Sequence, residues 1–191
     1  MPVRIVSAGG GGITLSAAST GSEFGLTLPA TNGALGISLG TAQNSTSGTS
    51  IDFTGIPAGV RRVTVMFRDV STNGTALYLV QLGTSGGIVS TGYVSTSVTT
   101  FNTNTTAGSN STAGMVIYSV SAGNTYSGAL TLINLTGNTW VSNHMFKSFT
   151  NSITGGAGDI ALGGVLDRVR ITTVGGTDTF DAGSINIAWE I

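Results

Sequence analysis

The chain of 191 residues is long enough for one domain with a buried core, and only 8% of its residues are charged. Its net charge of −1 provides no positive field for nucleic acid or anionic lipid, and no apolar run approaches the roughly 20 residues of a membrane helix. The absence of cysteine excludes disulfides, thiolate metal sites and a cysteine nucleophile. Because the mean hydropathy is +0.33, we expect part of the apolar surface to be buried against other copies of the chain.

The N-terminal region is predicted to form a short, extended arm of β-strands. The first six residues are predicted to form one strand, and the four glycines at residues 9–12 follow it. Ile13 and Leu15, and then Leu26 and Leu28, alternate with polar residues, which is typical of short strands. These strands contain too few large apolar residues to form a core alone. We therefore predict that residues 1–45 are an arm for attachment or intertwining, and that residues 46–191 form the main domain.

The clearest strand of the main domain spans residues 60–70, where apolar and polar residues alternate. The residues predicted to face the core are Val63, Val65 and Phe67, and those predicted to face outward are Arg62, Thr64 and Arg68. An Asn-Gly pair at Asn73 and Gly74 follows, and it predicts a hairpin to the next strand, residues 76–82.

Residues 76–82 are apolar on both faces of the predicted strand. A strand of this kind is covered on both sides, and we predict that a neighbouring subunit supplies the second cover. The predicted intersubunit residues are Leu77, Tyr78, Leu79, Val80, Arg62 and Arg68. A second interpretation stays open for all the arginines of the main domain, in which they are solvated or form ion pairs on the outer faces of two strands. These arginines are Arg61, Arg62, Arg68, Arg168 and Arg170. The candidate acids for these pairs are Asp52, Asp69 and Asp167.

Short apolar segments recur along the rest of the chain and are separated by Gly, Asn, Ser and Thr. They span residues 88–98, 114–120, 127–135, 139–149, 159–162, 166–174 and 184–191. The last segment alternates cleanly and is predicted to end inside a sheet. Val, Ile, Thr and Tyr dominate these segments, and no helical period of useful length occurs. The fold class that this pattern predicts is all-β, an antiparallel β-sandwich of jelly-roll type with the short N-terminal β arm.

Residues that enzyme chemistry or metal binding would require are sparse in this sequence. His144 is the sole histidine, and we predict no nucleophile elbow that would match it. Asp178 and Asp181 form a close acidic pair whose glycine neighbours favour turn caps, with a calcium site as the second interpretation. We predict no enzymatic activity and no cofactor.

Three ring-bearing residues are predicted to face a receptor, because aromatic side chains in a frame of Ser, Thr and Asn can stack on sugars. They are Tyr93, Trp140 and His144. Packing in the core or between subunits is the competing interpretation.

Three stretches carry a family resemblance. They are IDFTGIPAGVRRVTVMFRDVSTNGT, LVQLGTSGGIVSTGY and DTFDAGSINIAWEI. Together they resemble small virion proteins of tailed bacteriophages and prophages, which usually occur as C-terminal domains of tail fibres and form trimeric jelly-roll modules. The resemblance covers about residues 50–191.

The resemblance implies a homotrimer on the tail or capsid surface of a virion, assembled in the bacterial cytoplasm. Residues 1–45 would contact other virion proteins, and the main domain would bind a host surface glycan or protein, with no nucleic acid and no membrane insertion. Fibre proteins are usually much longer, so both a short fibre tip and a capsid decoration protein stay open. Two further classes compete with a virion protein. One is a polysaccharide depolymerase, which needs close carboxylates, and the second is a monomeric carbohydrate-binding module.

Overall fold

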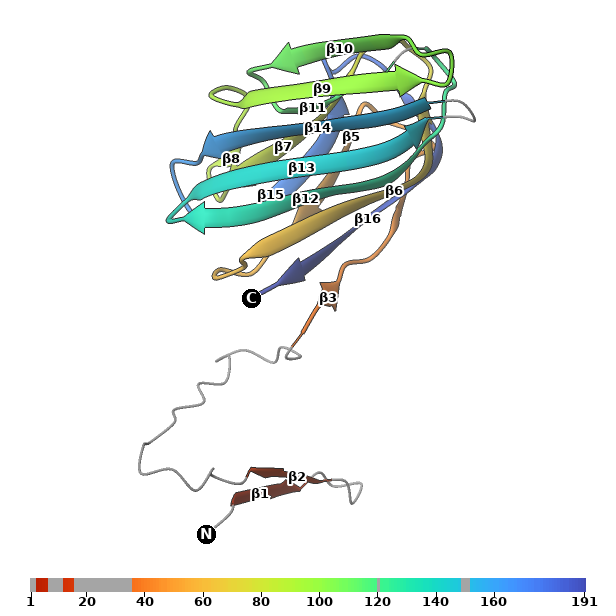
Figure 1. The fold of residues 1–191 in the computed structure, drawn as a ribbon. Coiled ribbons are helices and arrows are strands. Elements are labelled where there is room, and N and C mark those ends of the chain that lie inside the picture. The colour runs from red at the N-terminus through yellow and green to blue at the C-terminus, as the bar shows by residue number, and fades with distance from the viewer. Residues whose placement is uncertain (1–2, 7–11, 16–35, 120, 149–151) are drawn as a thin grey trace. The chain divides into compact units, whose positions relative to one another are not determined.

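The structure is a computed structural model that describes residues 3–6, 12–15, 36–119, 121–148 and 152–191 (Figure 1). The chain divides into two compact units, Met1–Gly33 and Ala34–Ile191. In the first unit β1 (Val3–Val6) pairs with β2 (Gly12–Leu15) as an antiparallel hairpin. The predicted strands around Leu26 and Leu28 lie outside the described residues.

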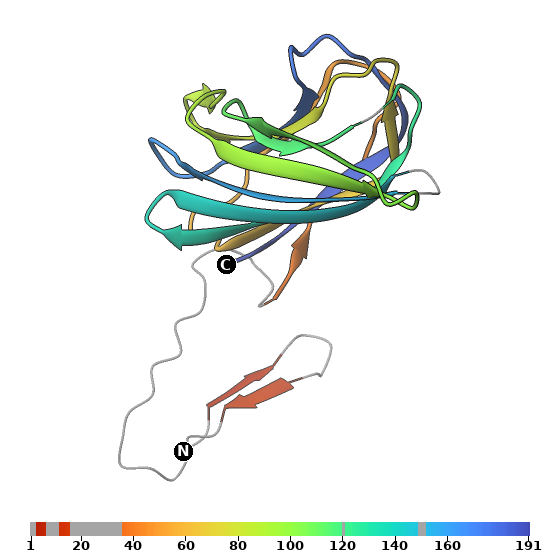
Figure 2. The same cartoon turned by 45° about the horizontal axis from the view of Figure 1, so that its top comes forward.

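The second unit consists of two antiparallel sheets packed as a sandwich (Figures 1 and 2). The predicted class, an all-β antiparallel sandwich, is confirmed, and the jelly-roll connectivity stays a prediction. The described residues include no helix, and none of them forms a helical segment of the length and apolarity that a membrane crossing requires.

The larger sheet has nine strands in the order β10-β9-β14-β13-β12-β6-β16-β3, with β4 also paired to β16. The bounds of its strands are β3 (Ser38–Leu39), β4 (Gln43–Asn44), β6 (Arg62–Thr72), β9 (Val94–Phe101), β10 (Thr106–Ser111), β12 (Tyr126–Thr136), β13 (Thr139–Ser148), β14 (Ser152–Ala161) and β16 (Phe180–Glu190). Because β3 and β4 belong to this sheet, residues 36–45 pack on the main domain, whereas the sequence pattern predicted that they belong to the arm.

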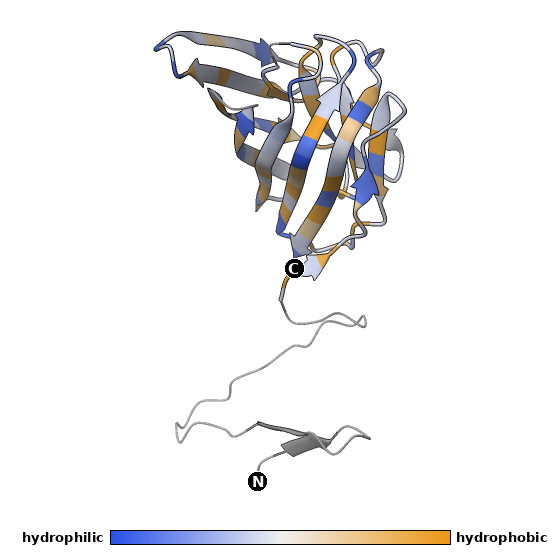
Figure 3. Cartoon of the chain, turned by 90° about the vertical axis from the view of Figure 1, so that its right-hand side faces the viewer, coloured by the Kyte–Doolittle hydropathy of each residue, from blue (hydrophilic) through white to orange (hydrophobic). Residues whose placement is uncertain are grey.

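The smaller sheet has five strands in the order β11-β7-β15-β5, with β8 paired to β7. The bounds of its strands are β5 (Ser50–Thr54), β7 (Tyr78–Thr84), β8 (Gly87–Ile88), β11 (Met115–Ile117) and β15 (Arg168–Thr173). Bands of opposite hydropathy alternate along several strands of the two sheets, as the period of two requires (Figure 3).

The predicted alternation in β6 is confirmed. Val63, Val65 and Phe67 are buried in the core between the sheets, while Arg62 and Arg68 are exposed. The last strand is confirmed in the same way, because Ile185 and Ile187 of β16 are buried and the strand pairs with both β6 and β3. Phe67, Tyr78 and Tyr126 pack edge to face at the centre of the core, with ring centroids 6.1 Å and 5.3 Å apart.

The hairpin predicted at Asn73 and Gly74 is wrong, because β6 belongs to the larger sheet and β7 to the smaller one. The segment between them crosses from one sheet to the other. Asn73 exchanges hydrogen bonds with the backbone of Thr179, and Asp178 accepts a hydrogen bond of 2.8 Å from the Ala76 amide. Gly74 lies against the Asp178 carboxylate, where a Cβ atom would clash. The Asn-Gly pair therefore lies in the segment that crosses from the larger sheet to the smaller one, and the β15–β16 loop holds this segment in place.

Two strands escaped the sequence-based prediction. β10 is made only of small polar residues with Ala107 and Gly108, and β14 was predicted only at residues 159–162. The missed part of β14 is rich in glycine, which usually weakens a strand. Here Gly156 lies under the His144 ring and Gly158 lies under Ser95, so side chains of neighbouring strands fill the space that the glycines leave.

Candidate functional site

The three predicted receptor-facing residues are buried, so that prediction is wrong. The exposed fractions of Tyr93, Trp140 and His144 are 1%, 3% and 6%. Trp140 and His144 stand at inward positions of β13, and the Tyr93 hydroxyl accepts a hydrogen bond from the Leu82 amide and donates one to the Val89 carbonyl. All three side chains stabilise the interior of the sandwich.

The chain itself covers three of the predicted intersubunit residues. Tyr78 and Val80 of β7 lie in the core, and Leu79 is 3% exposed on the other side of the strand, opposite Val116 and Thr172. Because the single chain already buries Leu79, no neighbouring subunit is needed to cover this side of β7. The predicted contact at Tyr78, Leu79 and Val80 is therefore wrong. Leu77 is only half buried, and its predicted contact stays untested.

Four of these arginines form ion pairs within the chain, as the second interpretation predicted, whereas Arg61 bonds to Asn134. Asp52 binds the Arg170 guanidinium through two hydrogen bonds of 2.7 and 2.6 Å, Arg168 binds Asp167, and Arg68 lies 4.0 Å from Asp69. The pKa of Asp167 is lowered chiefly by its hydrogen bond to Arg168. Arg62 pairs with Glu190 at 3.3 Å. The proposed intersubunit roles of Arg62 and Arg68 stay predictions.

The outer surface of the larger sheet is the most unusual surface in the described part of the chain. We call it the open face and define it as the outward residues of β16, β6, β12, β13, β14 and β9. Strand register places these residues in rows across the sheet. Two middle rows contain no charged residue. One consists of Asn186, Met66, Ala129, Met145, Gly155 and Val98, and the other of Ala188, Thr64, Thr131, Asn143, Ala157 and Thr96.

Large apolar side chains are exposed on the open face. Val94 is 68% exposed, Met145 65%, Ile153 54%, Val98 45% and Ile133 39%. Single exposed apolar residues are ordinary, but a sheet face that combines several of them with small uncharged residues has the composition of a protein contact. The open face is therefore the candidate functional surface.

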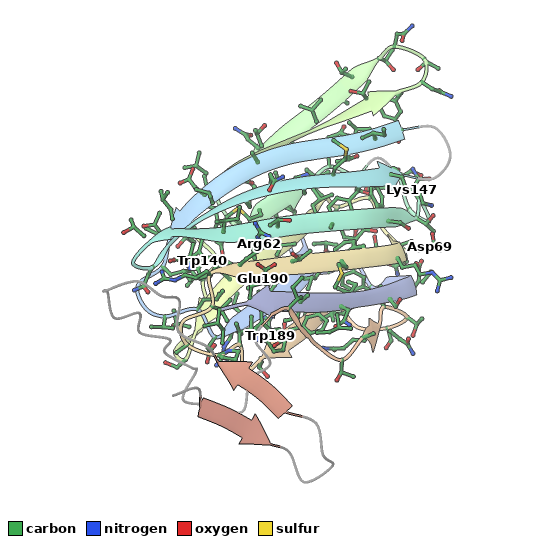
Figure 4. All side chains as sticks on the ribbon, turned by 60° about the horizontal axis from the view of Figure 1, so that its bottom comes forward. Arg62, Asp69, Trp140, Lys147, Trp189 and Glu190 are labelled. Atoms are coloured by element: carbon green, nitrogen blue, oxygen red, sulfur yellow. The ribbon has the colours of Figure 1, made fainter. Side chains whose placement is uncertain are left out.

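Charged residues lie only at the two ends of the open face. Arg62 and Glu190 lie together at one end and Asp69 and Lys147 at the other (Figure 4). Asp69 accepts hydrogen bonds from Ser127 and Lys147, and the Ser127 bond is the main cause of the lowered pKa of Asp69. A partner covering the middle rows would leave these charges in water at the rim.

The orientation of β9 is the opposite of the one that its hydrophobic pattern predicts, and this inversion contributes to the open face. In β9, Ser95, Ser97 and Thr99 point into the core, and Val94 and Val98 point to solvent. A hydrophobic pattern predicts the reverse orientation. Hydrogen bonds of the inward hydroxyls explain this orientation. Ser95 donates a hydrogen bond to the Gly114 carbonyl and accepts one from the Val116 amide, so it supplies partners to backbone groups at the unpaired edge of β11.

The inward hydroxyls belong to a polar part of the core, which we call the hydroxyl cluster. Its members are Ser95, Ser97, Thr99, Ser142, His144 and Thr154. Ser97 Oγ lies 3.0 Å from His144 Nε2, accepts a hydrogen bond from the Tyr118 amide and donates one to the Gly155 carbonyl. With its proton on Nε2, His144 donates to Ser97, and only the bare Nδ1 atom lacks a partner.

A serine beside a histidine resembles part of a catalytic relay, but this pair is enclosed. No acid orients Nδ1, and burial lowers the pKa of His144 to about 4, so the ring is neutral at pH 7. Among the described residues no group of three potential metal ligands comes together. Asp178 accepts a hydrogen bond from the Ala76 amide and Asp181 accepts one from the Ser71 hydroxyl, so both acids join segments far apart in the sequence and neither bond caps their own turn as predicted.

Comparisons of the chain with models of protein families, with curated proteins and with solved structures found no match. The resemblance to fibre proteins therefore stays a prediction.

Proposed function

We propose that the chain is a structural protein of a tailed-bacteriophage virion, a short fibre or fibre tip that forms a homotrimer and binds the host surface. In this proposal the N-terminal arm, predicted as residues 1–45, attaches the protein to other virion proteins through its residues before Ala34, because residues 36–45 pack on the sandwich. The sandwich presents a glycan- or protein-binding surface, and the protein catalyses no reaction. The family resemblance of residues 50–191 is the starting point, and the all-β sandwich is compatible with it.

The open face is the observation that carries the proposal. Its middle rows are uncharged, and Met145 and Val98 expose large apolar area there. A protein that works as a monomer rarely leaves such a face in water, because contiguous exposed apolar patches promote association. Permanent assembly covers these patches, and assembly is what a virion protein of this class requires.

The oligomeric mass tests the assembly part of the proposal. Size-exclusion chromatography with light scattering on the full chain should give a stable multimer at micromolar concentration. Met145→Lys should weaken the multimer, because a buried contact would then contain an unpaired charge. Val165→Lys is the matched control, since Val165 is also exposed but lies in the loop after β14. A stable wild-type monomer would contradict the proposal.

Location in the virion tests the rest of the proposal. Antibodies against the sandwich, visualised on phage particles by electron microscopy, should bind the tail, and the purified protein should adsorb to host cells. Binding to the head without adsorption to cells would instead identify a capsid decoration protein. Release of reducing sugar from host polysaccharide would identify an enzyme and overturn the structural role.

A further inference from the structure

We propose that two copies of the chain pack open face to open face across a two-fold axis, with Arg68 of each copy inserted beside Asp159 of the other. The partner is thus a second copy of this chain, and the contact is reciprocal. This contact rests on the proposed function, because it uses the same open face, but a homotrimer can form without it.

Asp159 is the one acid in the described part of the chain that has no hydrogen bond or ion pair. Four other acids form ion pairs, namely Asp52, Asp69, Asp167 and Glu190. Asp178 and Asp181 are bonded to an amide and a hydroxyl. Asp159 instead stands on β14 between Val141 and Val94, which are directly opposite it on the neighbouring strands. This carboxylate between two valines therefore lacks a partner that every other acid in the described part of the chain possesses.

A hollow of about 580 Å³ opens beside this carboxylate on the open face. Its wall residues include Val94, Thr96, Asn110, Val141, Ala157 and Asp159. The valines offer apolar contact to an alkyl stem, while the carboxylate and the Asn110 carbonyl oxygen accept hydrogen bonds. An arginine side chain matches this combination, because it has an apolar stem and a guanidinium that binds carboxylates through two parallel bonds.

Arg68 is an available cation in the described part of the chain. Its side chain is 86% exposed, and its only described ion pair is a 4.0 Å approach to Asp69. Asp69 already binds Ser127 and Lys147 at shorter distances, so Arg68 gains little from it. Moving Arg68 into a partner's hollow therefore costs the chain little electrostatic energy within itself.

Arg68 and Asp159 lie at opposite corners of the open face. Arg68 belongs to β6 and to the end row with Lys147, whereas Asp159 belongs to β14 and to the end row with Arg62. A two-fold axis that lies in the plane between the two faces, through the midpoint of the line from Arg68 to Asp159 and perpendicular to it, brings each Arg68 opposite the Asp159 of the other copy. Both Arg68–Asp159 contacts therefore form together. Isologous contacts of this kind are self-complementary by symmetry.

The area of the open face suits a stable contact. Its six strands are about 4.8 Å apart and its four rows about 6.8 Å apart, so the face covers roughly 800 Å², the area that each partner buries in a standard interface. The uncharged middle rows lie at the centre of this area, where burial requires no desolvation of charge. Both proposed ion pairs lie at the periphery.

Charge reversal tests the reciprocal contact on the full chain. Arg68→Glu and Asp159→Lys each place like charges together twice per contact, and each should raise the dissociation constant at least about tenfold. The double variant Arg68→Glu/Asp159→Lys recreates both pairs with reversed sign and should restore wild-type association. Thr54→Lys is the matched control, because Thr54 is exposed on the smaller sheet. Failure of the double variant to recover would overturn the pairing.

A single introduced cysteine tests the two-fold axis, since the chain has no cysteine of its own. Met145→Cys lies near the centre of the face and should cross-link to its counterpart with a short bismaleimide, whereas Val165→Cys should not. Light scattering should give an even number of copies, which is six if two of the proposed homotrimers pair through their open faces. A mass of three copies without Met145→Cys cross-links would overturn this inference and leave the proposed function intact, whereas a monomer would contradict both.

Discussion

Two halves of one core solve the same packing problem with different chemistry. On the inner side of the larger sheet, β6, β12 and β16 contribute apolar residues such as Val65, Leu132 and Ile187, which are almost fully buried. On the same side of β9, β13 and β14, the hydroxyl cluster is buried just as deeply, with Ser97, Thr99 and Thr154 at 0% exposure. Equal burial therefore does not imply equal hydrophobicity.

The difference follows from what each half faces. The apolar half packs against the interior of the smaller sheet, where contact area determines stability. The hydroxyl cluster faces the free edge of β11, whose amides need acceptors. The stability of the apolar half should therefore be insensitive to pH but should fall when a buried side chain is shortened. The hydroxyl cluster should be sensitive to protonation and to loss of a hydrogen-bond partner.

The largest effect is expected in the apolar half. Leu132→Ala removes a side chain with 0% exposure and should lower the free energy of unfolding by about 2–5 kcal/mol, because a cavity remains. Denaturant titration at fixed protein concentration measures this change. Its neighbour Ile133 is 39% exposed, so Ile133→Ala should change stability by less than about 1 kcal/mol. Equal losses in the two variants would contradict the assignment of the core face.

Acid should destabilise the hydroxyl cluster. The pKa of His144 is about 4 in the folded chain against an ordinary 6.5, so between these values the unfolded chain binds the proton more readily. Stability is complete above about pH 6.5 and should decrease as the pH falls, by about 3 kcal/mol at pH 4. Unfolding free energies at pH 7.5 and pH 4.5 measure the loss. His144→Gln removes the titrating group, and an unchanged pH dependence in that variant would contradict the prediction.

A methyl group added under His144 should cost somewhat less. In Gly156→Ala the new Cβ would lie 2.3 Å from the Thr96 carbonyl oxygen and 2.5 Å from His144 Cε1, so we expect a loss of about 2–3 kcal/mol. The adjacent Gly155 has only the His144 carbonyl oxygen nearby, at 3.7 Å, and Gly155→Ala should be nearly neutral. Thermal unfolding of the two variants measures the difference, and a reversed order would show that β14 is packed differently.

The smallest effect is expected for the hydrogen bond between Thr99 and Thr154, two residues of the hydroxyl cluster with no exposed surface. Thr99→Val leaves the Thr154 hydroxyl buried without this partner and should cost about 1–2 kcal/mol. Replacing both threonines by valine removes both polar groups and should restore most of the stability. A double-mutant cycle measures the coupling, and additive losses would rule out the bond as the cause.

Sequence patterns predicted the orientation of strands that bury their apolar residues and expose their polar ones. β6 and β16 place apolar residues at every second position and bury them, so their orientation could be read directly. The ion pairs of Asp52, Asp69 and Asp167 were predicted as a second interpretation, because acids and arginines recur on the same predicted strands. The candidate surface was not predicted, because on β9 the valines point outward and the serines inward.

The sequence by itself determined that this protein is built of short antiparallel strands, that it has very little charge, and that β6 and β16 bury their branched side chains. These properties depend on composition and on a period of two, which are local. Only the tertiary structure decided that residues 73–77 cross between sheets, that glycine-rich β14 is a central strand, and that Tyr93, Trp140 and His144 are interior. The orientation of β9 depends on hydrogen bonds to β11, and the place of β14 depends on side chains of β9 and β13 that fill the space over its glycines. Such contacts join residues far apart in the chain, so no local pattern contains them.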